Sequence, residues 1–205
     1  MQIVNMQTED SLNIVGDFFE GNSKGIILLH MFQKTKLSWR NFAEKLNKEG
    51  YTVLAIDFRG HGESDDNWKN FVEKDFNNMI EDVKAAKAFL KMYGVNEIGV
   101  IGASIGANTA LNYAMEDDNL RFVVLLSLGM NYKGINIEDS DCDKPILIVA
   151  SKDDVQSFKD SKEIFENINS KDKQIELFEN AGHGTDMFKD SKLEPLLLEF
   201  VKKNI

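Results

Sequence analysis

A short run around one serine carries the strongest chemical signal in this sequence: Gly102-Ala103-Ser104-Ile105-Gly106. A β-rich run over 98–102 precedes the serine, and a segment with helical spacing over 105–114 follows it. A nucleophilic serine on a sharp strand-to-helix turn needs neighbours without bulk two residues away, and the helix start offers it free N–H groups and a positive dipole end. The pattern predicts that Ser104 is a nucleophile. A glycine-rich turn without chemistry is the alternative that these five residues alone leave open.

A serine nucleophile needs a base, and the base needs an acid to orient it; both residue types follow later in the chain. His183 has a glycine on either side, which suits a tight loop that projects an imidazole. Asp153 and Asp154 come directly after an apolar run over 146–150. The order serine, aspartate, histidine is the one expected for a serine on such a turn, and α/β sheets bind ligands at the carboxyl ends of their strands. These residues together predict a catalytic triad.

The glycines around Ser104 also allow another interpretation, the dinucleotide-binding turn of short-chain dehydrogenases. That turn follows the first strand of its fold, ends on a glycine where this chain has Asn108, and works with a Tyr-x-x-x-Lys pair. No tyrosine of this chain has a lysine four residues later, and no Gly-x-Gly-x-x-Gly occurs. The sequence therefore argues against a dinucleotide, and we expect no cofactor.

The apolar pattern predicts the elements that must position these residues. Near-continuous apolar runs, typical of strands buried on both faces, alternate with segments of helical spacing. This alternation predicts the α/β class, with a mostly parallel central sheet and helices on both faces. Two edge strands are expected to form an antiparallel hairpin at the N-terminus. The expected strands cover 2–6, 12–18, 25–30, 51–57, 98–102, 122–128, 145–150 and 173–178, and the expected helices cover 38–48, 76–90, 105–114, 158–168 and 193–203.

Composition excludes several classes of function. The chain has 205 residues and a net charge of −10, which fits one domain over 1–205. An acidic surface repels phosphate backbones and anionic lipid, so we expect neither nucleic acid nor a membrane as a partner. With three histidines, one cysteine and no HExxH or CxxC spacing, we expect no metal site. The sequence has no recognisable targeting signal and no apolar run of membrane-spanning length, so we expect a cytoplasmic protein.

Taken in order, the motifs resemble those of the α/β-hydrolase family over nearly the whole chain. The apolar run 26–30 with Met31-Phe32 resembles the family's strand and oxyanion turn, usually His-Gly-x. Asp57-Phe58-Arg59-Gly60-His61-Gly62-Glu63-Ser64 resembles its D-x-R-G-H-G-x-S loop. The runs around Ser104, Asp153 and His183 resemble its nucleophile elbow, acid loop and base loop.

The resemblance implies a role for each of these residues. Alignment with the family's strand-end G-x-x-D places the acid at Asp153, while a one-residue shift in that turn would give the place to Asp154. The backbone N–H groups of Phe32 and Ile105 would stabilise the oxyanion. Met31 stands where the family has glycine, and a methionine there still leaves the next N–H free.

Other residues near these motifs are expected to have supporting roles. His30 would brace the oxyanion turn by hydrogen bonding, His61 would fix its own loop, and Ser64 would serve in a turn or cap. Met31, Phe32 and Met130 are expected to line the substrate pocket. The 129–144 segment is too short for the helical cap of many relatives, so we expect an open site and no separate lid domain.

These observations predict a serine hydrolase that cleaves an acyl ester or thioester through Ser104, His183 and Asp153. Its partner would be a small-molecule acyl substrate. An acyltransferase with the same triad is one alternative that the sequence leaves open. A ligand-binding or receptor member of the fold without turnover is the other.

Overall fold

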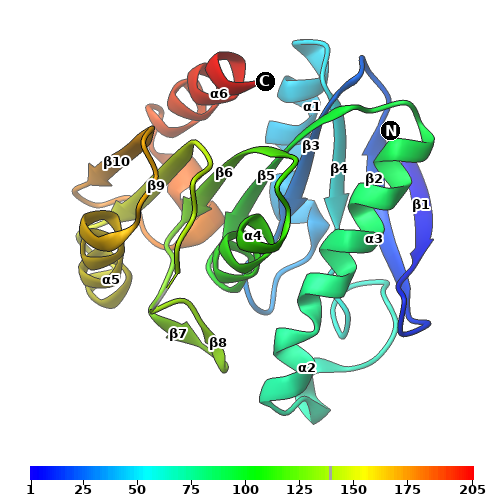
Figure 1. The fold of residues 1–205 in the computed structure, drawn as a ribbon, viewed down its shortest axis with the longest axis horizontal. Helices are drawn as coiled ribbons and strands as arrows, with labels where there is room; N and C mark the ends of the chain where they lie inside the picture. The colour runs from blue at the N-terminus through cyan, green and yellow to red at the C-terminus, as the bar shows by residue number, and fades with distance from the viewer. Residues whose placement is uncertain (139) are drawn as a thin grey trace.

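The computed structural model describes residues 1–138 and 140–205, which form an eight-stranded sheet with helices on both sides (Figure 1). The strand order is β1-β2-β4-β3-β5-β6-β9-β10. The strands of this sheet are β1 (Gln2–Gln7), β2 (Asn13–Phe19), β3 (Lys24–Leu29), β4 (Thr52–Ile56), β5 (Glu97–Ala103), β6 (Leu120–Leu126), β9 (Ile146–Ser151) and β10 (Lys173–Phe178).

Strand directions follow the predicted α/β pattern. The hairpin partner β1 is antiparallel to β2, and β2 is antiparallel to β4. All remaining neighbours, from β4 to β10, pair in parallel. The central strands β3, β4, β5 and β6 are buried almost throughout, as strands covered on both faces must be. The expected fold class and the N-terminal hairpin are confirmed.

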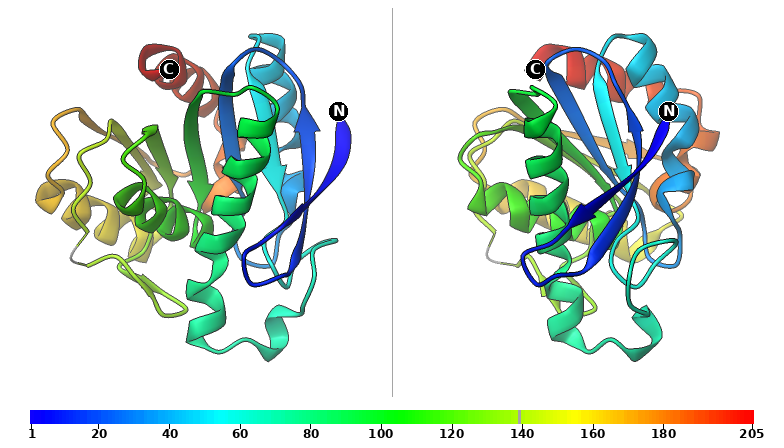
Figure 2. Two further views of the ribbon diagram at one scale, coloured as in Figure 1. Left: turned by 45° about the vertical axis from the view of Figure 1, so that its right-hand side comes forward. Right: turned by 90° about the vertical axis from the view of Figure 1, so that its right-hand side faces the viewer.

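Helices cover the two faces of the sheet in separate layers. The helices α1 (Arg40–Lys48) and α6 (Leu193–Asn204) pack on one apolar layer, and α3 (Met79–Met92), α4 (Ile105–Glu116) and α5 (Val155–Asn167) pack on the other. The right-hand view of Figure 2 shows α1 and α3 on opposite sides of the β1–β2 hairpin. Each layer therefore buries one face of the sheet, and the strand ends are left to carry loops.

Several short elements were not predicted from the sequence. These are η1 (Lys36–Trp39), η2 (Trp68–Asn70), α2 (Glu73–Asn77), η3 (Gly184–Lys189) and a small hairpin of β7 (Asn131–Tyr132) and β8 (Ile135–Asn136). In the described part of the segment between β6 and β9, the two strands of this hairpin are the only regular elements. Most boundaries differ from expectation by a few residues. Two of these differences lie beside the expected site: β9 continues to Ser151, and α5 begins at Val155.

The carboxyl ends of β3, β5, β6 and β9 lie side by side at one edge of the sheet, because these strands are parallel neighbours. Loops after these strands carry Phe32, Ser104, Ser127 and Asp154. The loop after β10, which neighbours β9, carries His183. Among the described residues, no helix has the length and apolar character needed to cross a membrane.

Candidate active site

Ser104 stands on a strained turn between β5 and α4. Its φ of 54° and ψ of −118° lie where residues with a side chain are rare. Two glycines make the turn possible: a Cβ at Gly102 would come within 2.1 Å of the Gly106 carbonyl oxygen, and a Cβ at Gly106 within 2.6 Å of the Leu29 carbonyl oxygen. The glycine spacing noted in the sequence therefore has a steric cause in the fold.

Backbone contacts fix the serine while its hydroxyl stays free. The Ser104 N–H donates to the Leu126 carbonyl at 2.8 Å, and the Ser104 carbonyl accepts from Ala107 and Asn108 at the start of α4. Within the described residues the buried Oγ has no hydrogen-bond partner, and Ser104 is 1% exposed. The open site expected from the short 129–144 segment stays a prediction.

His183 is paired with an acid in the way a catalytic base requires. Its Nδ1 lies 2.6 Å from Oδ2 of Asp154. A proton on Nδ1 donates to this carboxylate and leaves Nε2 as the acceptor that can take a proton from a nucleophile. The predicted pairing of His183 with Asp153 is thus corrected: the neighbouring aspartate holds the ring.

The cause of the correction is the length of β9. The sequence suggests that this strand ends at Ala150, but Ser151 still pairs with Phe178 of β10, so the turn begins one residue later. Asp154 then occupies the first position before α5, and its carbonyl accepts from the N–H of Phe158 at 2.9 Å. A shift of one residue exchanges the two aspartates.

Asp153 also serves the base loop, although it does not contact the imidazole. Its two carboxylate oxygens each lie 3.1 Å from the N–H of Gly182. Its carboxylate also accepts from the hydroxyl of Ser151, which in turn accepts from the N–H of Ala181 at 2.7 Å. The Ser151 hydroxyl, and then the Gly182 N–H, hold the pKa of Asp153 below its ordinary value. The residue predicted as the acid is therefore an anchor for the loop that carries the base.

The turn after β3 holds a free peptide N–H in a fixed direction. The Met31 carbonyl accepts from Nδ1 of His30 at 2.8 Å and from the N–H of Lys34 at 3.1 Å. This carbonyl and the N–H of Phe32 belong to one planar peptide group, so fixing one fixes the other. In the part of the chain that the structure describes, neither Phe32 nor Ile105 donates its N–H to a protein group. Both N–H groups are thus without a protein acceptor in the described structure, as the oxyanion hypothesis requires.

The methionine in this turn is compatible with the backbone. Among the described residues the left-handed position of the turn is Gln33, with a φ of 61°, and not Met31. Glycine is therefore not required at position 31. The Met31 side chain packs on the base loop: its Sδ accepts from the Thr185 hydroxyl at 3.6 Å and would lie 2.7 Å from a Cβ at Gly184.

His30 is a neutral brace for this turn, as its place in the sequence suggests. Its Nδ1 donates to Met31, and its Nε2 accepts from the N–H of Phe58 at 3.0 Å. Complete burial, and next the nearby His61, lower the pKa of His30 to about 4. The imidazole that is protonated in the unfolded chain near pH 6 is therefore neutral in the fold.

This shift predicts a pH dependence of stability. Because the folded pKa of His30 lies below its unfolded value of 6.5, the unfolded chain binds more protons, and stability falls as the pH drops from 6.5 toward 4. The loss amounts to about 3 kcal/mol for this residue. We expect His30→Asn, whose amide keeps a donor but does not titrate, to lack this part of the slope in urea unfolding between about pH 7 and 4. Equal slopes for both proteins would contradict the assignment.

The loop after β4 is a buried polar network that supports the turn. Lys36 donates from its backbone N–H at 2.7 Å and from Nζ at 2.5 Å to the carboxylate of Asp57, and Nζ also contacts Glu63 at 2.6 Å. The Ser64 hydroxyl donates to the Asp57 carbonyl and accepts from Val15. The role of Ser64 is structural, but its hydroxyl joins this loop to β2 instead of capping a turn. The sequence analysis missed Lys36, because an isolated lysine gives no sign that it is buried.

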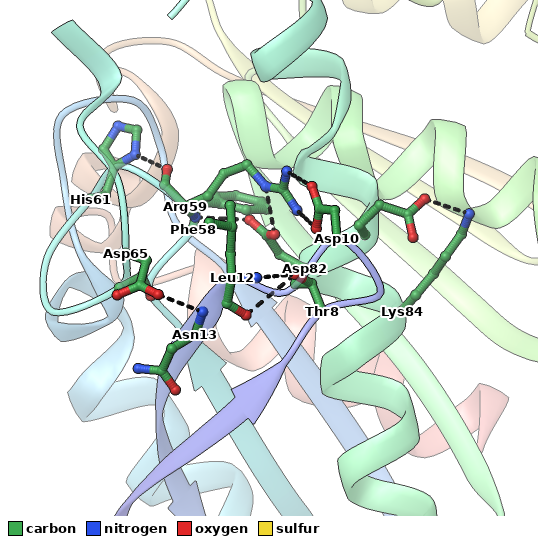
Figure 3. A network of polar contacts seen from close by, with 12 residues as sticks. Thr8, Asp10, Leu12, Asn13, Phe58, Arg59, His61, Asp65, Asp82 and Lys84 are labelled. Carbon is green, nitrogen blue, oxygen red and sulfur yellow. Dashed lines mark hydrogen bonds and ion pairs between the residues drawn. The ribbon is translucent and has the colours of Figure 1, made fainter. Parts of the chain in front are cut away.

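A second network ties the same loop to the N-terminal hairpin (Figure 3). Arg59 donates from its backbone N–H and from Nε to Asp82 of α3, both at 2.8 Å, and from its two terminal nitrogens to Asp10. Arg59 lowers the pKa of Asp10 to about 2, whereas burial raises that of Asp82 to about 7. His61 contacts the Arg59 carbonyl through Nδ1 at 3.0 Å, as expected of a residue that fixes the loop.

The other expected pocket residues lie in different surroundings. The ring of Phe32 packs against His61, Trp68, Phe76 and Tyr132, with centroid distances between 4.8 and 6.3 Å. Met130 instead lines a groove of about 460 Å³, together with Ser140, Asp141 and residues of α5 such as Glu163. Of the three residues, Met31 is the one placed against the base loop.

Asn108 holds the β7–β8 segment in place near the elbow. Its amide donates to the carbonyls of Gly129 and Ile135 at 2.7 and 3.0 Å and accepts from the N–H of Gly129. The residue that replaces a glycine of the dinucleotide pattern therefore has a structural role. It connects α4, which begins directly after Ser104, to the segment between β6 and β9.

Comparisons with known proteins agree with the fold. A family model described as alpha/beta hydrolase fold matches residues 25–140, more than half of the chain. The chain is 33% identical over 111 residues to Epoxide hydrolase B of Mycobacterium tuberculosis, a match that covers 54% of this chain and 30% of that protein. It is 31% identical over 129 residues to Thiohydrolase aneE of Aspergillus aculeatus, covering 59% of this chain and 39% of that protein.

The curated matches span about a third of the relatives' own length, while a solved structure matches throughout. An esterase from Pyrococcus furiosus has a TM-score of 0.80 and 23% sequence identity, over 99% of this chain and 90% of that chain. Its similarity supports the fold. The family match over residues 25–140 shows that the chain belongs to the α/β-hydrolase fold family.

Proposed function

We propose that this protein is a serine hydrolase that cleaves small acyl esters or thioesters through Ser104, His183 and Asp154. The observation that carries the proposal is the 2.6 Å contact between His183 Nδ1 and Asp154, because it leaves Nε2 as a free base. The strained turn of Ser104 supports it, since strain of this kind is kept where the surrounding structure requires a special side-chain position.

In this mechanism Ser104 Oγ attacks the acyl carbonyl while His183 Nε2 takes its proton. The negative oxygen of the tetrahedral intermediate accepts from the N–H groups of Phe32 and Ile105, each worth about 3 kcal/mol in comparable sites. His183 then protonates the leaving alcohol or thiol. Water, activated by the same imidazole, releases the acid and restores the serine. Asp154 keeps the proton on Nδ1 and stabilises the imidazolium.

The chemistry of a serine nucleophile favours acyl substrates over epoxides, although several relatives are named epoxide hydrolases. Serine attack on an epoxide carbon would form an ether, which this site has no means to hydrolyse. Attack on an acyl carbon forms an ester, which the same base and oxyanion donors can cleave. The names esterase and thiohydrolase among the similar proteins agree with this choice.

Labelling with a fluorophosphonate and turnover of acyl substrates test the proposal. We expect covalent labelling at Ser104, located by mass spectrometry of the digested protein. A panel of p-nitrophenyl esters and thioesters of increasing acyl length should show burst kinetics, because the acyl-enzyme accumulates. Folded protein that neither labels at Ser104 nor turns over any member of the panel would contradict the hydrolase and favour a binding protein. Product that forms only with an added alcohol or thiol would indicate acyl transfer.

A further inference from the structure

Ser127 occupies an unusual position at the carboxyl end of β6. It is 2% exposed and has a φ of 53°, a left-handed value that residues with a side chain seldom adopt. Its N–H donates to the Val149 carbonyl of β9 at 2.8 Å, so the backbone is held there by the sheet. Glycine would adopt this conformation more easily, which raises the question of what the serine hydroxyl contributes.

The hydroxyl of Ser127 reaches the loop that carries the base. Its Oγ accepts from the N–H of Gly184 at 2.8 Å, in a buried contact between residues 57 positions apart. Gly184 directly follows His183 and itself has a φ of 55°. In the described structure the hydroxyl also donates to Sδ of Met187, at 4.0 Å. The main contact of Ser127 is therefore the peptide group next to the imidazole.

The same residue is joined to the nucleophile through one peptide unit. The Leu126 carbonyl, bonded to the Ser127 nitrogen, accepts from the N–H of Ser104 at 2.8 Å. The carbonyl and the hydroxyl thus contact the elbow and the base loop from adjacent positions. If the base loop moved relative to the turn that carries Ser104, one of these two hydrogen bonds would have to break.

We propose that Ser127 is a positioning residue that sets the location of His183 relative to Ser104, and the proposal rests on the function proposed above. Three contacts then hold the base: Asp153 binds the Gly182 N–H before it, Asp154 binds its ring, and Ser127 binds the Gly184 N–H after it. Ser127 thus fixes the backbone on the C-terminal side of His183. The strained backbone is kept because glycine, the easier residue, has no hydroxyl.

Ser127→Gly and Ser127→Ala separate this role from a structural one. Glycine removes the hydroxyl and leaves the buried Gly184 N–H without its acceptor, but it also relieves the strained backbone. The melting temperature should therefore fall less in Ser127→Gly than in Ser127→Ala, which keeps the strain. We nevertheless expect kcat to fall about 10- to 100-fold with KM little changed, because a small displacement of a catalytic group has an effect of this size. Ser127→Ala should show the same loss of kcat with a lower melting temperature. Ser11→Gly, which relieves a φ of 70° in the β1–β2 turn, is the matched control and should keep full kcat.

Two further measurements decide the proposal. Hydrogen exchange of the Gly184 amide, which needs no substrate, should be at least about tenfold faster in Ser127→Gly than in the wild type. In a His183→Ala background, Ser127→Gly should cause no further loss of turnover, because it acts through the imidazole. Unchanged Gly184 exchange, or wild-type kcat in Ser127→Gly, would overturn the proposal. A wild-type protein without ester turnover would instead overturn the proposed function, and the exchange result would still decide the placement of the loop.

Discussion

Ser104→Ala is expected to lower acyl-ester turnover by about four to six orders of magnitude, since the members of a triad act as a unit. The fold should remain intact. The Ser104 hydroxyl has no partner among the described residues, so its removal breaks no hydrogen bond and leaves no buried group unpaired. The melting temperature should therefore be equal to that of the wild type or slightly higher, while kcat collapses.

Ser161→Ala is the matched control for this change. Ser161 also carries a buried hydroxyl without a partner in the described structure, but it lies in α5 away from the elbow. Its replacement should leave kcat unchanged. His183→Ala should resemble Ser104→Ala, and the double variant should lose little more. Turnover in Ser104→Ala within about tenfold of the wild type would remove the serine from the mechanism.

The fold could be predicted from the sequence because its main signals are local. Buried parallel strands read as continuous apolar runs, and the helices between them have helical spacing, so the α/β class follows without knowledge of the strand order. The elements that were missed are short. The hairpin of β7 and β8 has two residues in each strand and depends on contacts with Asn108, which lies far away in the sequence.

The site was predictable to the extent that each residue is set by its own neighbourhood. Ser104 can be recognised by two nearby glycines, at positions where any residue with a Cβ atom would clash with the backbone. His30 can be recognised by its position at the end of a buried strand. The turn after β9 favours Asp153 over Asp154 when only the sequence is considered, because the end of β9 depends on pairing with β10 and not on the residues of the turn. Ser127 had no signal at all: a positive φ at a non-glycine residue appears only when the structure is known.

Asp154→Asn should show which aspartate serves the triad. An asparagine keeps the size of the side chain, but its amide favours the wrong tautomer of His183 and cannot stabilise the imidazolium. The comparable change in a serine protease lowers kcat about 10⁴-fold, and we expect a similar loss here. The measurement is kcat for an activated ester at neutral pH, with the melting temperature recorded to confirm folding.

Asp153→Asn is the matched partner, since it makes the same chemical change one residue away. The carboxamide oxygen can still accept from the Gly182 N–H, which the carboxylate now contacts at 3.1 Å, so we expect a loss of about tenfold or less. The ratio of the two kcat values separates two effects. Asp154 orients the imidazole ring and balances its charge, whereas Asp153 anchors the base loop. A larger loss of kcat in Asp153→Asn than in Asp154→Asn would contradict this assignment. Asp153 would then be the acid that orients His183, and the contact between Asp154 and His183 would have no role in catalysis.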